Sequence, residues 1–338
     1  MVPKFRIAST LILFSSLTAF GQGQVPVATS SQQATATAPK SSFTTEIKKT
    51  IAYIEADCLV EGKIEPHSAT AFFIIKPDDR LGKDRGFEYL VTNRHAAQPG
   101  IENGTPCQVV NYAIRMNLRD ASTGGSKATN FILGPNLQWV FPDDPSVDLA
   151  VVPMAPDRTK VDYEPLSTTM LATEDVVKTK GIGEGDPIVY TGLFVQMPGL
   201  MKLEPIVRQG IIAMMPDEPI FTTLKKPGSL YLADTHVFEG NSGSPMFVNL
   251  GGVRNGQIMM GYDYRLLGVV SGYADEDTKF NFQVVTTYSG KFGANSGVAT
   301  VVPAKELDNL LNSAKLQALR EDGVKKVAAS EGIGGNLK

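Results

Sequence analysis

The sequence predicts an all-β fold built from two successive β units and followed by one α-helix. Short apolar segments rich in β-branched and aromatic residues recur along the chain, and the same rhythm resumes after a polar stretch at 157–180. Turn-forming residues separate the segments, and the chain holds 32 Gly and 21 Pro, which suits a turn-rich β protein better than a helix bundle. Strands of this length and spacing indicate a sandwich or a barrel.

The first 21 residues have the layout of a secretory signal peptide. Lys4 and Arg6 form a basic start, an apolar run follows at 7–20, and small residues stand at Ala19 and Gly21. An uncleaved membrane anchor is the alternative, but the run is shorter than the about 20 residues that a membrane span needs. We therefore expect an exported protein, periplasmic or extracellular, with no stable membrane anchor after cleavage.

Residues 22–45 are predicted to form a flexible linker. They are rich in Gln, Ala, Thr, Ser and Pro. Such a segment buries too little apolar surface to offset the entropy of ordering it.

The two β units are expected at 46–160 and 161–302, from apolar segments bounded by Pro, Gly, Asn and Asp. In the first unit the expected strands are 51–60, 69–75, 89–92, 112–118 and 148–154. In the second unit they are 188–195, 206–214, 229–234, 245–248, 266–273, 280–287 and 297–302.

The last segment, 303–338, is predicted to hold a helix and a tail. Pro303 suits a first helical turn. Leu307, Leu310, Leu311 and Ala314 recur at helical spacing. We expect this helix to pack on the second β unit and the chain to fray after about Asp322.

The charge balance narrows the classes of partner. Lys and Arg number 32 against 35 Asp and Glu, for a net charge of −3, so no basic surplus favours a nucleic-acid partner. With 20% charged and 42% hydrophobic residues, the chain is not a charge-rich disordered protein. The 3 His are far apart in the sequence, and we expect no metal and no cofactor.

Three short segments carry candidate catalytic residues. His95 follows the end of a buried strand in Thr92-Asn93-Arg94-His95-Ala96-Ala97, and Asp148 heads an apolar strand, where a charge is costly to bury without a donor. Ser242 lies among small residues in Gly240-Asn241-Ser242-Gly243. Taken singly, each has a plain structural explanation: a hydrogen-bonded His, a turn Asp and a Gly/Ser turn.

Taken together, the three residue types fit nucleophilic catalysis. A serine hydroxyl becomes a nucleophile when a neutral imidazole takes its proton, and a carboxylate holds that imidazole in the right tautomer. The oxyanion that forms needs preorganised N–H donors. The amides of Gly240 and Ser242 can supply them from one curved turn.

On these motifs the chain resembles the chymotrypsin/trypsin-fold serine peptidases, and within them the bacterial trypsin-like group that includes the HtrA proteases. The resemblance covers about residues 48–315 and also includes the segment from Ser68 to Ile74. It implies two six-stranded antiparallel β-barrels with the active site between them. It also implies that His95 is the general base, Asp148 its orienting partner, Ser242 the nucleophile, and the Gly240 and Ser242 amides the oxyanion hole.

The sequence departs from the family in three respects. Asn241 replaces the Asp that pairs with a new N-terminal amine in digestive enzymes, so we expect no activation by that route. Ala96 stands where the secretory enzymes have a Cys. The 36 residues after Val302 are too few for the PDZ domain of full HtrA proteins, so we expect none.

The resemblance also suggests a specificity pocket. His236 is expected at its base, with Ser271, Gly272 and Tyr273 along its wall, on a strand that pairs with the substrate backbone; a His236 pointing away into a strand pair is the alternative. His67 has no matching role and is expected to be structural.

Four other features are expected to carry no chemistry. The second Asn-Ser-Gly, around Ser296, runs into a strand, and the glycine-rich segment 181–186 is expected to be a hairpin turn. Asp275-Glu276-Asp277 is expected to be a solvated acidic loop. Asn103-Gly104-Thr105 fits a glycosylation acceptor only in a eukaryotic secretory pathway. In an oxidising compartment Cys58 and Cys107 are able to pair, and the sequence leaves this open.

The hypothesis from the sequence is an exported serine endopeptidase that cleaves polypeptides through an acyl-enzyme. A catalytically weak or inactive module of the same fold that binds a peptide or protein is the alternative. An esterase or other acyl transferase on the same scaffold is a third possibility.

Overall fold

The computed structural model describes residues 42–83, 85–119, 127–254, 257–259, 263–283 and 287–334. The expected signal peptide and residues 22–41 of the expected linker lie outside this range. Side chains are not described at 253, 257–259, 275–283, 287–295 and 330–334.

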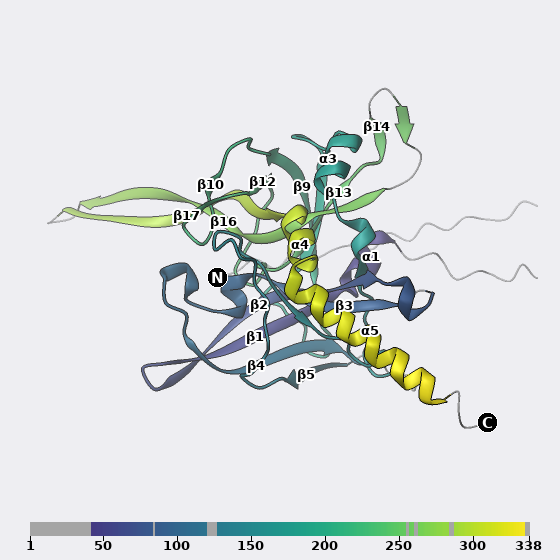
Figure 1. The fold of residues 1–338 in the computed structure, drawn as a ribbon. Coiled ribbons are helices and arrows are strands. Elements are labelled where there is room, and N and C mark those ends of the chain that lie inside the picture. Colours follow the sequence, from purple (N-terminus) through teal and green to yellow (C-terminus); the bar gives the residue numbers. More distant parts are fainter. Residues whose placement is uncertain are drawn as a thin grey trace, which may run out of the picture. The chain divides into compact units, whose positions relative to one another are not determined.

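A seven-stranded sheet forms the first β unit (Figure 1). Its strand order is β5-β4-β1-β2-β3-β6, and β7 adds in parallel to β2. The strands are β1 (Ile51–Val60), β2 (Lys63–Pro77), β3 (Gly86–Thr92), β4 (Gln108–Asn117), β5 (Ala128–Ile132), β6 (Ala150–Pro153) and β7 (Leu166–Ser167). A disulfide joins Cys58 at the end of β1 to Cys107 just before β4, with their Cα atoms 5.7 Å apart.

The second β unit is a closed antiparallel barrel with the strand order β12-β17-β16-β13-β8-β9. Its strands are β8 (Pro187–Gly192), β9 (Ile206–Met214), β12 (Tyr231–Asp234), β13 (Pro245–Asn249), β16 (Tyr264–Gln283) and β17 (Thr287–Pro303). The all-β class with a six-stranded antiparallel barrel is therefore confirmed. The first unit departs from the expected six-stranded antiparallel barrel, because it has seven strands, β7 is parallel, and β5 and β6 are not paired with each other. Val140 forms an isolated bridge with Val151 of β6.

Several short elements lie between these strands. Two small hairpins pair β10 (Ile220–Phe221) with β11 (Pro227–Gly228), and β14 (Gly252–Arg254) with β15 (Gln257–Met259). The helical turns are α2 (Arg94–Ala97), η1 (Asp79–Leu81), η2 (Ile101–Asn103) and η3 (Thr168–Met170). Elements of two or three residues are too short to show a hydrophobic period, so the sequence does not predict them.

Helix α1 (Phe43–Lys48) occupies the end of the segment expected to be a linker. Ser42 caps it by accepting a hydrogen bond from the Thr45 amide. Phe43 stacks on Tyr264 at a centroid distance of 3.6 Å and meets the edge of the Phe247 ring. This aromatic contact explains why Phe43–Thr45 are folded despite their polar surroundings in the sequence.

Helix α3 (Glu174–Lys180) lies within the polar stretch between the two units. Thr173 caps it, acidic residues fill its first turn, and Gly181 ends it in the left-handed conformation at φ 60°. The glycine-rich segment 181–186 therefore joins a helix to β8 and is not a hairpin turn.

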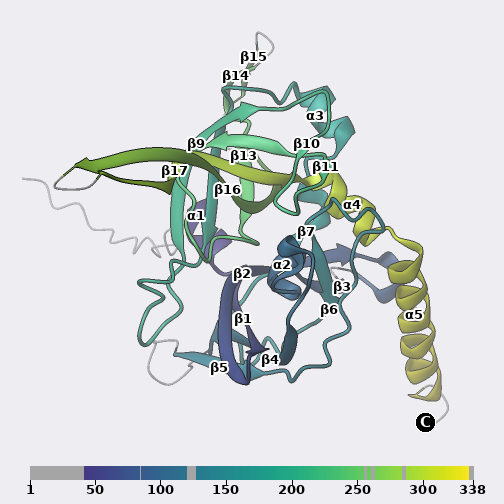
Figure 2. The same ribbon diagram turned by 90° about the vertical axis from the view of Figure 1, so that its left-hand side faces the viewer.

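Two consecutive helices follow the barrel, α4 (Ala304–Leu311) and α5 (Ala314–Gly334) (Figures 1 and 2). α4 buries Leu307, Leu310 and Leu311 and packs on β16 and β17, as expected. The expectation of fraying after about Asp322 is wrong for residues 323–334. Its middle holds Lys325, Lys326, Ala328 and Ala329, which are strong helix formers, and Lys326 forms an ion pair with Asp322 one turn away.

Apolar side chains from both β units share one core. Phe72, Val91 and Leu149 of the first unit belong to the same buried cluster as Phe247 and Val269 of the barrel. Continuous packing of this kind fixes the position of one unit against the other. None of the helices in the described part of the chain is both long and apolar enough to span a membrane.

Candidate active site

His95 and Asp148 are in direct contact. His95 lies on α2, directly after β3, and its Nδ1 is 2.7 Å from Asp148 Oδ2. The other carboxylate oxygen, Oδ1, accepts a hydrogen bond from the His95 amide at 3.0 Å. Asp148 is fully buried, whereas 20% of the His95 side chain is exposed. The carboxylate therefore fixes the orientation of the ring, and the rest of the imidazole faces a cavity.

The protonation of this pair follows from its surroundings. Burial alone would raise the pKa of Asp148, but the adjacent His95 and the hydrogen bonds from His95 and Ser271 outweigh burial and hold that pKa below its usual value. Burial alone would lower the pKa of His95, but the Asp148 carboxylate, with a smaller contribution from Glu102, raises it above its usual value.

A chain of hydroxyl groups reaches Asp148 from the barrel side. Ser271 Oγ on β16 donates to Asp148 Oδ2 at 2.5 Å. Because this uses its only proton, the 2.6 Å contact between Ser271 and Thr223 has Thr223 Oγ1 as donor. Thr223 lies in the loop between β10 and β11, and the sequence offered no motif that would have identified it.

The turn that carries Ser242 is held by tight contacts to the first β unit. Gly243 has a φ of +87°, and a Cβ there would lie 1.9 Å from the carbonyl oxygen of Thr70. The Thr70 hydroxyl donates to the Gly240 carbonyl at 2.7 Å and accepts from the Leu193 amide at 2.8 Å. Glycine at 243 is therefore required by both backbone conformation and space.

Asn241 supports the turn from the inside. It is fully buried, and its Oδ1 accepts hydrogen bonds from the Phe238 amide and the Tyr190 hydroxyl, while its Nδ2 donates to the Leu193 carbonyl. A neutral amide thus satisfies its polar neighbours without any charged partner.

The amides of Gly240 and Ser242 form no hydrogen bond to other described residues, unlike the neighbouring amides of Asn241 and Gly243. Gly240 adopts a φ of +88°. Two free amides on one turn beside a serine are the arrangement that an oxyanion site needs.

Ser242 Oγ donates a 3.2 Å hydrogen bond to the Ser271 carbonyl. Among the described residues no hydrogen bond links it to His95. Ser242 and His95 nevertheless line one cavity of about 380 Å³ between the two β units. A rotation about the Cα–Cβ bond of Ser242 would redirect its hydroxyl, and such bonds are often long or misaligned in the absence of substrate.

The same cavity decides which expected pocket residues lie near the candidate triad. Ser271, Gly272 and Tyr273 all line it, although the Ser271 side chain is turned toward Asp148. His236 does not line the cavity, so its expected place at the base of the pocket is wrong. Its exposed ring lies beside Gly297 and Phe238. His67, expected to be structural, does line the cavity, together with Glu102 and Glu239.

The other features from the sequence lie apart from this cavity. Ser296 donates to the Ala274 carbonyl. Asp275-Glu276-Asp277 belong to strand β16 and not to the expected loop, and their side chains lie outside the described part. Asn103, the last residue of η2, accepts a hydrogen bond from Lys225 Nζ. Across the described ranges, no three His, Cys, Asp or Glu side chains cluster as metal ligands would.

No family model and no curated protein matches the sequence. Several solved structures are similar in fold. Deg5 is 18% identical over 68% of this chain and 81% of its own, with a TM-score of 0.40. The HtrA-type protease AlgW with a decapeptide is 16% identical over 79% of this chain and 64% of its own, with a TM-score of 0.41. The Rv3671c protease from M. tuberculosis, in its active form, is 19% identical over 79% and 82%, with a TM-score of 0.40.

The closed six-stranded antiparallel barrel agrees with the trypsin-like fold that the sequence motifs predict. With identities below 20%, these likenesses concern the fold alone, and the case for a chemical function lies in the side chains around the cavity.

Proposed function

We propose that the protein is an exported serine endopeptidase that hydrolyses peptide bonds through an acyl-enzyme. The observation that carries the proposal is the buried Asp148 carboxylate, which holds both the Nδ1 and the backbone amide of His95 on the wall of the cavity that Ser242 also lines. A buried carboxylate oriented on a largely buried imidazole is costly to maintain unless the imidazole has a task.

In the proposed reaction Ser242 is the nucleophile. Its hydroxyl turns from the Ser271 carbonyl toward His95 Nε2 and loses its proton to that nitrogen as Oγ attacks the scissile carbonyl carbon. The oxyanion accepts hydrogen bonds from the Gly240 and Ser242 amides. His95 then passes the proton to the leaving amine, and an ester joins the acyl group to Ser242. A water activated by His95 hydrolyses this ester.

The decisive test compares Ser242→Ala with Ser296→Ala, which removes the hydroxyl of the second Asn-Ser-Gly. Loss of Ser242 is expected to reduce casein or peptide hydrolysis by at least about 10³-fold, because only binding and the oxyanion site remain. Ser296→Ala is expected to retain wild-type turnover. Equal hydrolysis by wild type and Ser242→Ala would reject the proposal.

One observation favours a second candidate, a peptide-binding module with negligible turnover. Ser242 Oγ is engaged with the Ser271 carbonyl and not with His95. A fluorophosphonate probe separates the two candidates, because it labels only an activated serine. Labelling of the wild type that is absent in Ser242→Ala supports the peptidase, and the absence of labelling in both supports the binding module.

A further inference from the structure

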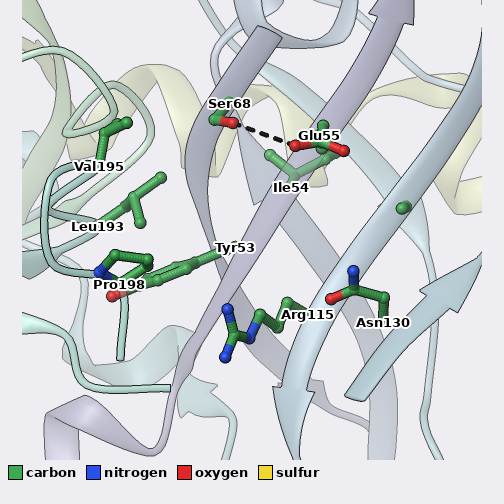
Figure 3. A pocket seen from close by; sticks show the side chains of 10 residues that line it. Tyr53, Ile54, Glu55, Ser68, Arg115, Asn130, Leu193, Val195 and Pro198 are labelled. Carbon is green, nitrogen blue, oxygen red and sulfur yellow. Dashed lines mark hydrogen bonds between the residues drawn. The ribbon is translucent and has the colours of Figure 1, made fainter. Parts of the chain in front are cut away.

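A second cavity, of about 170 Å³, lies near the catalytic one, and we call it the side cavity; Figure 3 shows the residues that line it. Tyr53 and Glu55 of β1, Ser68 of β2, and Leu193, Val195 and Pro198 after β8 are among its lining residues. Ser68 lines both cavities. The two cavities therefore lie on either side of Ser68.

The wall of the side cavity touches the turn that holds the candidate oxyanion site. A Cβ placed on Gly240 would lie 2.5 Å from Val195 Cγ2 and 3.1 Å from Leu193 Cδ2. The side cavity therefore begins directly beside the turn where the scissile carbonyl would lie.

This position sets which part of a substrate reaches the side cavity. In the function proposed above, on which this step rests, the segment before the cleaved bond lies along Ser271–Tyr273, at the barrel end of the catalytic cavity. The segment after the bond must then leave past Gly240 and Ser68. It enters the side cavity.

Two polar groups in the side cavity lack a full set of partners. The Tyr53 side chain is only 6% exposed, yet within the described ranges its hydroxyl has no hydrogen-bond partner. Burial raises the pKa of Tyr53 well above its usual range, so the hydroxyl remains protonated; its oxygen is enclosed and reaches a peptide carbonyl only when the cavity wall shifts.

Glu55 is the second such group. Its carboxylate accepts one long hydrogen bond, 3.4 Å from Ser68 Oγ, and it forms no ion pair within the described ranges. The cation nearest in the lining, Arg115, donates to the carbonyls of Gly199 and Leu200 and points away from Glu55 in Figure 3. A partly buried carboxylate without a cation favours a ligand that brings one.

We propose that the side cavity binds the substrate segment that follows the cleaved bond, and that Glu55 selects a Lys or Arg side chain in it. When the cavity wall shifts to admit that segment, the Tyr53 hydroxyl donates a hydrogen bond to its backbone. The side chain of the leaving peptide, in addition to that of the acyl part, would then determine where this protein cuts.

The test is a peptide library of random sequence, digested by the full-length protein and read by mass spectrometry. In wild-type products Lys and Arg are expected to be enriched within the first four positions after the cut. Glu55→Gln is expected to reduce that enrichment by about tenfold, since a charge-assisted hydrogen bond is lost. Glu65→Gln, which removes an exposed carboxylate from the same β1–β2 hairpin outside the cavity, is expected to keep it.

Tyr53→Phe is a second test, and its outcome does not depend on whether Glu55→Gln folds. It removes only the unpartnered hydroxyl, so the folded state loses no internal hydrogen bond. It is expected to raise KM for a peptide that extends past the cut by about threefold. It is not expected to raise KM for an ester with no residue after the cut.

Each failure has its own signature. If the wild type is neither labelled by a fluorophosphonate nor active on any peptide, the proposed function itself fails, and this inference fails with it. Labelling without peptide cleavage overturns the inference, because the side cavity then has no leaving peptide to bind. Cleavage without enrichment of Lys and Arg, or enrichment that survives Glu55→Gln, overturns the inference and leaves the peptidase proposal intact.

Discussion

At the scale of single residues, the hydroxyl of Thr223 is the outermost member of a hydrogen-bond chain that ends at His95. Thr223 donates to Ser271, Ser271 donates to Asp148, and Asp148 accepts from the His95 ring. Hydrogen bonds in series polarise one another, so the first donor strengthens the second. A residue outside the sequence motifs thereby acts on the basicity of the imidazole.

The pH dependence of activity tests this chain. His95 works as a base only when neutral, and its pKa lies above the usual 6.5, so kcat/KM should rise with pH through a midpoint above 6.5. Thr223→Val removes the first donor, leaves Asp148 more basic and so stabilises the imidazolium. The midpoint is expected to move to higher pH, and kcat/KM near pH 7 to fall about threefold.

Thr223→Ser is the matched control, because it keeps the hydroxyl. Its pH profile should coincide with that of the wild type. If Thr223→Val and wild type show the same midpoint, Thr223 is only a wall residue of the cavity.

The residues with direct chemical tasks in the proposed function are the ones that a sequence can reveal. His95, Asp148 and Ser242 are detectable because each is an unusual choice for its local context, and the chemistry demands these residue types. Thr223 and Glu55 gain their significance only from contacts between segments far apart in the chain, 48 residues for Thr223 and Ser271. The sequence does not predict the position of His236, because a separation of six residues from Ser242 does not determine how the segment between them folds.

At the scale of elements, the Cys58–Cys107 disulfide closes the covalent loop that contains His95. The loop spans 49 residues and includes β2, β3 and α2. A crosslink of this length restricts the unfolded chain and is worth about 4 kcal/mol in the chain-entropy model.

Replacing both cysteines by alanine is expected to lower the free energy of unfolding by about 2–4 kcal/mol, measured by urea denaturation. A reductant should destabilise the wild type similarly and should leave the double variant unchanged. Equal midpoints for oxidised wild type and double variant would show that the crosslink adds nothing to stability.

The elements themselves were predictable in proportion to their length and periodicity. The expected ranges 51–60 and 206–214 coincide with β1 and β9, because both are long and hold several apolar β-branched residues. Helix α3 was missed although Thr173 and Gly181 are ordinary start and stop signals, since Val176 and Val177 provide too short an apolar pattern. The β10–β11 pair has two residues per strand and no pattern at all.

At the scale of the whole described unit, the C-terminal helices connect the two β units. α4 packs on the barrel strands, and α5 reaches the first sheet, where the buried Arg320 donates to the Tyr89 hydroxyl on β3 at 3.0 Å. The same guanidinium nitrogen donates to the Leu311 carbonyl of α4 at 2.7 Å. One side chain therefore links α4, α5 and the first sheet.

Arg320→Met should loosen this connection. It keeps an apolar stem of similar length and leaves the buried Tyr89 hydroxyl and the Leu311 carbonyl without a donor, at a cost of about 2–3 kcal/mol in unfolding free energy. Lys315→Met, at an exposed position of α5, should change it by less than about 0.5 kcal/mol. Denaturant midpoints report both values, and a neutral Arg320→Met would show that the connection is dispensable.

The division of the site between two β units has a consequence for the order of synthesis. A ribosome completes His95 and Asp148 with the first sheet, adds Ser242 only with the barrel, and adds Arg320 after that. In the proposed function, a partly made chain therefore has the general base and its orienting carboxylate but no nucleophile, and the helix that joins the two units is made last. Chains whose synthesis stops before the barrel would then have no means of cutting their neighbours.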